Sequence, residues 1–225
     1  GMVTQAHTFY AGSHTFYSSS TSNIMLFKFN AGTLDFDWLI PCGVGSTTPP
    51  GVGGLASDGA GGVFVGGGLG GVAGSTTTFG GHSLTSTGAQ NNYIIRVSSS
   101  GSVQWAVNAG SSSSSNLYGY LYGLTTDGSG GAWVLGMLSS YTGAVTFGSS
   151  SVTCPYTAGC GVTFHVDSSG SLSNAVLISG SSSDVSVAIF VIGAGSSSGF
   201  YISGNKWDST GTIHIGSQSV TQMCA

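Results

Sequence analysis

Short apolar runs separated by glycine and serine form the dominant pattern of this chain. The runs 93–97 and 162–166 are rich in β-branched and aromatic residues, and each is followed by a Ser-Gly turn and a second apolar run. Leu34–Ile40 alternates strictly, which places Leu34, Phe36, Trp38 and Ile40 on one face and Asp35 and Asp37 on the other. No stretch fits the 3.6-residue period of a helix, so the pattern predicts an all-β fold.

A six-residue marker recurs along the chain at a fixed interval. It occurs at 12–17 (GSHTFY), 80–85 (GGHSLT), 148–153 (GSSSVT) and 216–221 (GSQSVT), with 68 residues from each copy to the next. A fixed period of this length indicates a tandem array of small supersecondary units. We therefore predict one tandem-repeat β domain over 1–225, with a partial unit at 1–45, units at 46–115 and 116–185, and a partial unit at 186–225.

Each unit is expected to contain about four short strands that form one β-sheet. An Asp-Gly turn and a strand open the unit, as in 58–65; the marker hairpin follows, and then two strands joined by a turn. Residues 41–54 are expected to form a connection because Pro49-Pro50 cannot continue a strand ladder. Ser-rich spacers are expected at 111–115 and 181–183. The array then holds about three sheet equivalents and is incomplete at both ends.

These units resemble the repeats of bacterial β-propeller proteins of the seven-bladed (SBBP) type. The matching stretches are Leu55–Gly66, the hairpin 78–81 with sequence Thr-Phe-Gly-Gly, and the strand pair 93–105. The resemblance implies propeller-like blades in an extracellular or cell-surface protein, without a shared catalytic residue. About three blade equivalents fall below the ~4 that close a propeller, so a closed ring would need a second chain.

Charged residues are scarce. They make up 4% of the chain, with three basic residues, seven Asp, no Glu and a net charge of −4. So few basic residues cannot neutralise several phosphates, and we expect no nucleic-acid partner. No apolar run approaches the ~18 residues of a membrane span, and we expect no membrane-spanning segment.

The polar residues do not form a pattern typical of catalysis. Asp35 and Asp37 are interpreted as a solvated strand face, and the aspartates at 58, 127 and 167 as turn residues because glycine or serine follows each. The chain contains no Gly-x-Ser-x-Gly elbow and no phosphate-binding loop. We therefore expect a protein that is not an enzyme and that binds no metal or cofactor. The tyrosines Tyr118, Tyr120 and Tyr122 alternate along one strand and are candidate sugar-stacking residues.

The four cysteines favour disulfides over metal binding. Cys154 and Cys160 bracket a short loop and are expected to form a local disulfide. Cys42 and Cys224 are expected to pair with each other, either between two copies or within one chain. Disulfides indicate an oxidising, extracellular location.

Two functional hypotheses follow. The first is a structural subunit of an extracellular assembly (a filament, sheath or appendage), with copies joined head to tail by strand complementation because incomplete units leave open sheet edges. The interface would involve Phe9, Phe16, Ile24, Leu26, Phe27, Tyr201, Ile213, Ile215 and Val220. The second is a carbohydrate-binding, propeller-like lectin that closes by oligomerisation and binds glycans through its tyrosines. Ser and Thr offer sites for O-linked sugar, whereas the chain contains no Asn-x-Ser/Thr sequon.

Overall fold

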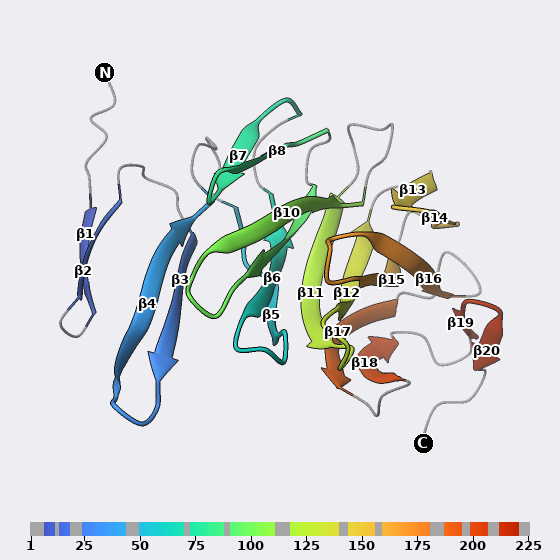
Figure 1. Ribbon diagram of the computed structural model, residues 1–225. Helices are drawn as coiled ribbons and strands as arrows, with labels where there is room; N and C mark the ends of the chain where they lie inside the picture. Colours follow the sequence, from blue (N-terminus) through green and yellow to red (C-terminus); the bar gives the residue numbers. More distant parts are fainter. Residues whose placement is uncertain are drawn as a thin grey trace.

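The computed structural model describes residues 7–11, 14–18, 24–43, 50–69, 73–87, 91–110, 118–139, 144–155, 159–180, 187–194, 199–206 and 212–220. Every regular element in these ranges is a β-strand, which confirms the predicted all-β fold class (Figure 1). The described residues contain no helix that could span a membrane. The expected spacers at 111–115 and 181–183 lie outside the described residues.

Two antiparallel four-stranded units form the centre of the molecule, and we call each a blade with strands a to d in chain order. Blade 1 consists of β5 (Gly54–Ser57), β6 (Val63–Gly68), β9 (Asn92–Val97) and β10 (Val103–Ala109). Blade 2 consists of β11 (Tyr118–Thr126), β12 (Ala132–Ser139), β15 (Cys160–Val166) and β16 (Leu172–Gly180). In both blades, strand a pairs with strand b, b with c, and c with d.

Two further strand pairs pack against the blades, one beside blade 1 and one beside blade 2, and we call each a half-blade (Figure 1). The first pairs β3 (Ile24–Asn30) with β4 (Asp35–Cys42), and its pairing of Lys28 with Trp38 repeats that of Arg96 with Trp105 in strands c and d of blade 1. The second pairs β17 (Val187–Ala194) with β18 (Phe200–Lys206). Its register shift between Ile189 and Val191 repeats, 68 residues on, the shift in β11, so it corresponds to strands a and b.

The marker hairpins lie outside strands a to d: three of them form two-stranded sheets of their own, and the last extends the sheet of blade 2. They are β1 (His7–Ala11) with β2 (His14–Ser18), β7 (Thr76–Phe79) with β8 (His82–Thr85), β13 (Ala144–Phe147) with β14 (Ser150–Thr153), and β19 (Ile213–Ile215) with β20 (Gln218–Val220). In blades 1 and 2 the hairpin is inserted between strands b and c, so a unit has six strands and not about four. The inserted hairpin is part of the 68-residue repeat period.

The three later hairpins each contact strand d of the preceding unit or the residue that follows it. The amide of Gly43, after β4, donates a hydrogen bond to the Thr78 carbonyl of β7, with an N···O distance of 3.1 Å. Gly110, after β10, lies against Phe147 of β13, and β19 pairs directly with β16. The hairpins therefore tie successive blades together.

Strand β4 departs from two sequence expectations. It extends through Pro41 to Cys42, although a connection was predicted from Pro41. Proline is tolerated there because β4 is an edge strand, with β3 as its one partner among the described strands. A register shift between Phe36 and Trp38 also breaks the predicted alternation: Trp38 packs toward blade 1, whereas Phe36 contacts Phe27 and Phe29 on the other face.

The core consists of three clusters, each between neighbouring sheets. The first joins the β3–β4 half-blade to blade 1, the second joins blade 1 to blade 2, and the third joins blade 2 to the β17–β18 half-blade. Their fully or largely buried members include Ile24, Leu26 and Phe79 in the first, Phe64, Ile94 and Phe164 in the second, and Leu135, Ile178 and Ile192 in the third. Sheet faces that meet a neighbouring unit are thus buried by it.

Candidate functional site

An apolar groove runs along the open edge of β3. It has a volume of about 430 Å³ and is lined by Leu26, Phe27, Lys28, Phe29, Trp38, Leu55, Ser57, Gly61, Gly62 and Val63. Strand β3 and Trp38 form one wall, and the β5–β6 end of blade 1 forms the other. Among the described strands, β3 pairs only with β4. The groove therefore combines unpaired backbone groups with apolar side chains.

The complete blades show what occupies this place elsewhere in the fold. Strand c pairs with strand b in both, as β9 with β6 and β15 with β12. In blade 2, Leu124 of strand a is only 6% exposed because β5 and β6 of the preceding blade cover it. The equivalent Leu55 of blade 1 is 53% exposed at the groove. The groove thus lies where an a–b strand pair would pair with β3 and cover blade 1.

The outer face of the β3–β4 half-blade is also uncovered. Phe27 and Phe29 are about half exposed, and both rings make edge-on contacts with Phe36, with centroid distances of 5.3 and 5.6 Å. Their equivalents in blade 1, Ile95 and Val97, are completely buried against the half-blade that precedes them. An exposed aromatic cluster of this kind marks an interaction surface more often than a solvated face.

A basic residue recurs at one position of strand c. Lys28, Arg96 and His165 occupy it in β3, β9 and β15. Arg96 Nη2 lies 3.0 Å from Asp58 Oδ2 in blade 1, and His165 Nε2 lies 2.8 Å from Asp127 Oδ2 in blade 2. In the half-blade, Lys28 Nζ instead lies 2.9 Å from Asp37 of the neighbouring strand.

The aspartates of the a–b turns use both carboxylate oxygens. Oδ1 of Asp58 accepts the amides of Ala60 and Gly62, and Oδ1 of Asp127 accepts those of Ser129 and Gly131. Their predicted role as turn residues is therefore confirmed. The pairing of Oδ2 with strand c was not predicted. The signal for it was available, because Lys28, Arg96 and His165 are spaced 68 and 69 residues apart.

These contacts lower the pKa of the carboxyl groups. Burial alone would raise the pKa of Asp127, but hydrogen bonds from His165 and from the turn amides outweigh burial and bring the pKa to about 2. The pKa of Asp58 is lowered against the same effect of burial by the amides of its turn and by Arg96. The hydrogen bond from Lys28 lowers the pKa of Asp37.

Tryptophans on strands β4 and β10 connect these strands to the next unit. The indole N–H of Trp38 donates to the Ser99 carbonyl of the next c–d turn at 2.8 Å, and the ring covers Gly101, where a Cβ would come within 3.0 Å of it. Trp105 repeats the arrangement with Ser168 and Gly170, at 3.0 and 3.1 Å. The β3–β4 turn lacks the glycine, and β16 lacks the tryptophan. Leu34 occupies the glycine position in the β3–β4 turn. In β16, Ser173 pairs with His165 as Trp105 pairs with Arg96, and Asn174 follows it in a register irregularity with φ +53°.

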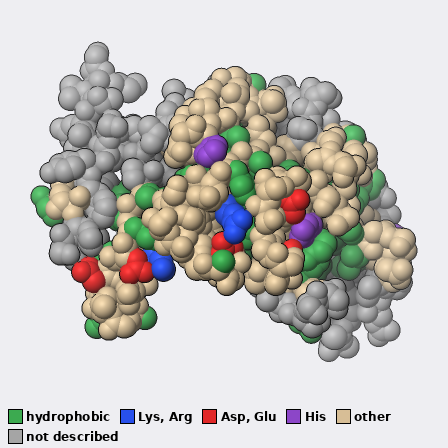
Figure 2. Space-filling model, viewed as in Figure 1, with side chains coloured by type: hydrophobic (Ala, Val, Ile, Leu, Met, Phe, Trp, Pro, Cys, Tyr) green, Lys and Arg blue, Asp and Glu red, His purple; other side chains and the backbone are tan. Residues whose placement is uncertain are grey.

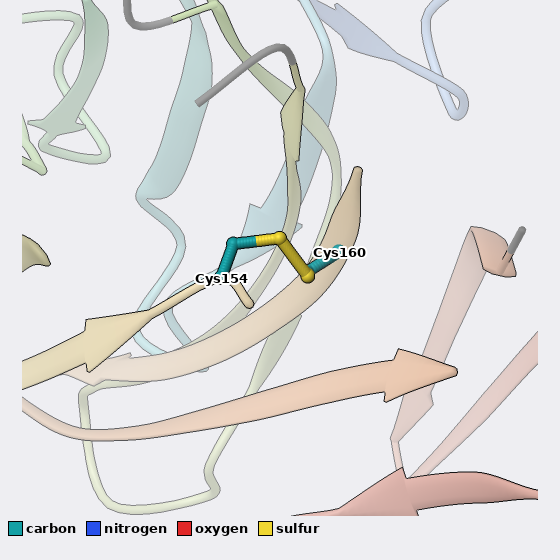
Figure 3. Close-up of a disulfide and its surroundings, with 2 residues drawn as sticks. All are labelled: Cys154 and Cys160. Atoms are coloured by element: carbon teal, nitrogen blue, oxygen red, sulfur yellow. A yellow bond between two sulfur atoms is a disulfide. The ribbon is translucent and has the colours of Figure 1, made fainter. Parts of the chain in front are cut away.

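Figure 3 shows the disulfide that joins Cys154 and Cys160, with a Cα–Cα distance of 5.9 Å. Both cysteines are fully buried, and the bond connects the end of β14 to the start of β15. It closes the same loop that the sequence indicated. The Cys42 side chain and Cys224 lie outside the described residues, so their pairing stays a prediction.

The structure does not bring the predicted interface residues together within one chain. Ile24 and Leu26 face blade 1, while Tyr201 on β18 is 74% exposed on the other side of the molecule. Ile213 and Ile215 pack in the third core cluster, where β19 pairs with β16. The side chains of Phe9, Phe16 and Val220 lie outside the described residues.

The tyrosine row is described only in part. Tyr120 is 44% exposed, and its ring lies nearly parallel to that of Tyr122, with centroids 6.2 Å apart. The Tyr122 hydroxyl lies 3.8 Å from the sulfur of Met137, and burial raises its pKa. The Tyr118 side chain lies outside the described residues.

Charged side chains appear as isolated spots on the face drawn in Figure 2. Among the described residues, no three His, Cys, Asp or Glu side chains are placed to hold a metal ion. No protein-family model matches the chain, and no curated protein matches it. The resemblance to propeller repeats therefore stays a prediction.

Proposed function

We propose that this protein is a structural subunit of an extracellular assembly, in which copies join by strand complementation at open sheet edges. One observation carries the proposal: the groove along β3 lies where strands a and b would complete a blade. An unpaired strand edge is a template for another strand, and the backbone hydrogen bonds formed there contribute affinity while the side chains select the partner.

The properties of the surface support association over catalysis. The groove is lined mainly by apolar and small residues, with Lys28 as its one charged side chain. The chain as a whole is only 4% charged, and charged residues are the usual protection against edge-to-edge pairing. The disulfide between Cys154 and Cys160 supports an oxidising compartment, because disulfides are rare in reducing ones.

Sizing and imaging test this function directly. Light scattering coupled to size-exclusion chromatography should give a mass that rises with concentration above the 22.3 kDa of one chain. Electron microscopy of the same sample then separates an open filament from a closed ring. A single species of one-chain mass at every concentration would refute the proposal.

Carbohydrate binding is a second candidate, favoured by the near-parallel rings of Tyr120 and Tyr122. Tyrosine faces stack on the apolar faces of sugar rings. A glycan array screened with the native chain and with Tyr120→Ala would test it. Binding that is lost in the variant supports the lectin hypothesis, and binding that the variant retains excludes these tyrosines as the site.

A further inference from the structure

We infer that β18 of one copy pairs with β3 of a second copy, so that the β17–β18 and β3–β4 half-blades together form a complete blade. This inference rests on the proposed self-assembly and specifies its junction. The two half-blades are the a–b and c–d halves of the same four-stranded unit, as their registers show. They belong to different sheets within one chain, so a second copy is needed to join them.

The complete blades supply the register of this junction. In blade 1, β6 and β9 pair Val63 with Val97, Phe64 with Arg96, and Gly66 with Ile94. Blade 2 repeats the pairing, with Trp133 opposite His165. Applied to the junction through the repeat interval, this register would place Tyr201 of one copy opposite Lys28 of the second, and Ser203 opposite Leu26.

An aromatic residue opposite the basic residue recurs in both blades. Arg96 Cζ lies 5.8 Å from the ring centroid of Phe64, and the rings of Trp133 and His165 are 5.0 Å apart. The contact of Arg96 with Phe64 is stabilised by attraction between the cation and the π face, and that of His165 with Trp133 is a contact between two rings. The half-blades contain the two separated members of a third pair: Tyr201, 74% exposed, and Lys28, which lines the groove.

Trp38 completes the receptor for this aromatic ring. In blade 1 the Phe64 ring also contacts Trp105, with centroids 5.9 Å apart. Trp38 is the equivalent of Trp105, and it lines the groove beside Lys28. Tyr201 of a second copy would therefore contact Lys28 and Trp38, the equivalents of the Arg96 and Trp105 that contact Phe64.

The contact between blades supports the same junction independently. In a joined pair of copies, strand d of blade 2 faces the β3–β4 turn of the second copy. The residues at that contact are Ser173 and Asn174 in place of tryptophan and Leu34 in place of glycine. The large side chain and the small one have exchanged sides, so Ser173 and Asn174 leave the space that Leu34, 75% exposed in the free copy, would fill.

Hairpin β1–β2 is not part of this junction. The hairpin of a unit packs against strand d of the preceding blade, and β19–β20 already fills that place beside β16.

Mixed cysteine variants test the register. In every chain Cys42 and Cys224 are replaced by serine, so that only the introduced cysteines can link copies. Ser203→Cys is mixed with Leu26→Cys, and separately with Ile24→Cys as the control. Leu26 and Ile24 are similarly buried aliphatic residues of one strand face, two residues apart. Directly opposite residues suit a disulfide, whereas diagonal neighbours lie too far apart.

The expected result is a reducible dimer whose yield is at least about tenfold higher with Leu26→Cys than with Ile24→Cys. Equal yields, or a higher yield with Ile24→Cys, would overturn the register. Assembly by light scattering without any cross-link would overturn this junction and leave the proposed function standing. A chain that stays monomeric and uncross-linked would refute both.

Tyr201→Ser provides a second readout that needs no introduced cysteine. We expect it to weaken self-association by about tenfold or more, since buried aromatic anchors dominate interfaces. Tyr120→Ser, which alters an exposed tyrosine on β11, is the matched control and should leave association unchanged. Equal association of the native chain and Tyr201→Ser would remove Tyr201 from the junction.

Discussion

The carboxylate of Asp127 makes two kinds of hydrogen bond, one within its own turn and one to a neighbouring strand. One oxygen accepts the amides of its own turn, and the other accepts a hydrogen bond from His165 on strand c. The carboxylate therefore fixes the a–b turn and also connects it to a strand 38 residues further along the chain. Asp58 repeats the arrangement with Arg96, which indicates that the connection is a property of the blade.

The low pKa of Asp127 predicts a loss of stability in acid. Its folded-state pKa of about 2 lies below the ordinary 3.8, so the unfolded chain binds the proton more readily. The stabilisation is complete above about pH 4 and is lost as the pH falls toward 2. Because solvent screens part of the interaction, we expect a loss of about 1 to 2 kcal/mol.

Urea unfolding between pH 2 and pH 7 measures this contribution. Asp127→Asn should be less stable than the native chain at pH 7 and should show a shallower decline on acidification. An unchanged decline in the variant would show that other carboxyl groups cause the acid sensitivity.

Leu34 adopts a backbone conformation that leucine rarely takes. Its φ is +56°, whereas Gly101 and Gly170 occupy the equivalent turns with φ near +90°. A left-handed conformation costs a non-glycine residue about 1 to 2 kcal/mol. Glycine loses more chain entropy on folding, so Leu34→Gly should stabilise the free copy by about 0.5 to 1 kcal/mol.

The same substitution should weaken self-association, because it removes the side chain that would face Ser173 and Asn174 across the junction. Thermal unfolding of dilute protein and sedimentation of concentrated protein measure the two effects. Effects of opposite sign are the expected result. A variant that is both more stable and equally associated would place Leu34 outside the contact.

At the scale of elements, close approach between blades depends on glycine at particular positions. A Cβ on Gly53 would lie 1.8 Å from the carbonyl oxygen of Leu121, which belongs to β11 of the next blade. Gly53→Ala would force β11 away and should cost about 1 to 3 kcal/mol. Gly51→Ala is the matched control, since a Cβ there meets nothing within 4 Å.

Chemical denaturation of the two variants compares these positions. Gly51→Ala should stay within about 0.5 kcal/mol of the native chain. Equal losses at both positions would show that contact between blades does not determine the effect.

Local features were predictable from the sequence, and features set by strand neighbours were not. The turn roles of Asp58 and Asp127 follow from amides two and four residues away, which the sequence displays directly. Their pairing with Arg96 and His165 depends on strand a–b lying beside strand c, which no local pattern specifies. The register shift between Phe36 and Trp38 was missed for a related reason, because a bulge adds one residue without a distinct sequence signal.

The position of the marker hairpins shows the same limit. Their period and turn residues indicated hairpins, and all four are present. Whether a hairpin joins the sheet or leaves it is decided by the partners of strands b and c, which pair with each other in both blades. The groove could not be predicted until this pairing showed which edge of β3 stays open.

At the scale of the whole molecule, each core cluster joins only neighbouring units. Stability in such an array is a sum of unit and nearest-neighbour contributions, so opening fluctuations start at the units with one neighbour. Amides of β9 and β12 should exchange with deuterium most slowly, and those of β3 and β18 most rapidly, in dilute protein. Mass spectrometry of peptides from these strands measures the gradient, and uniform exchange across them would contradict it.

Raising the protein concentration should slow exchange at β3 and β18 while leaving β9 and β12 unchanged. The half-blades would then gain order and a partner in the same step. Association of this kind carries an entropic cost that a preformed interface avoids, because part of the free energy of binding is spent on ordering the two edges. Local folding and growth of the assembly would be a single cooperative equilibrium.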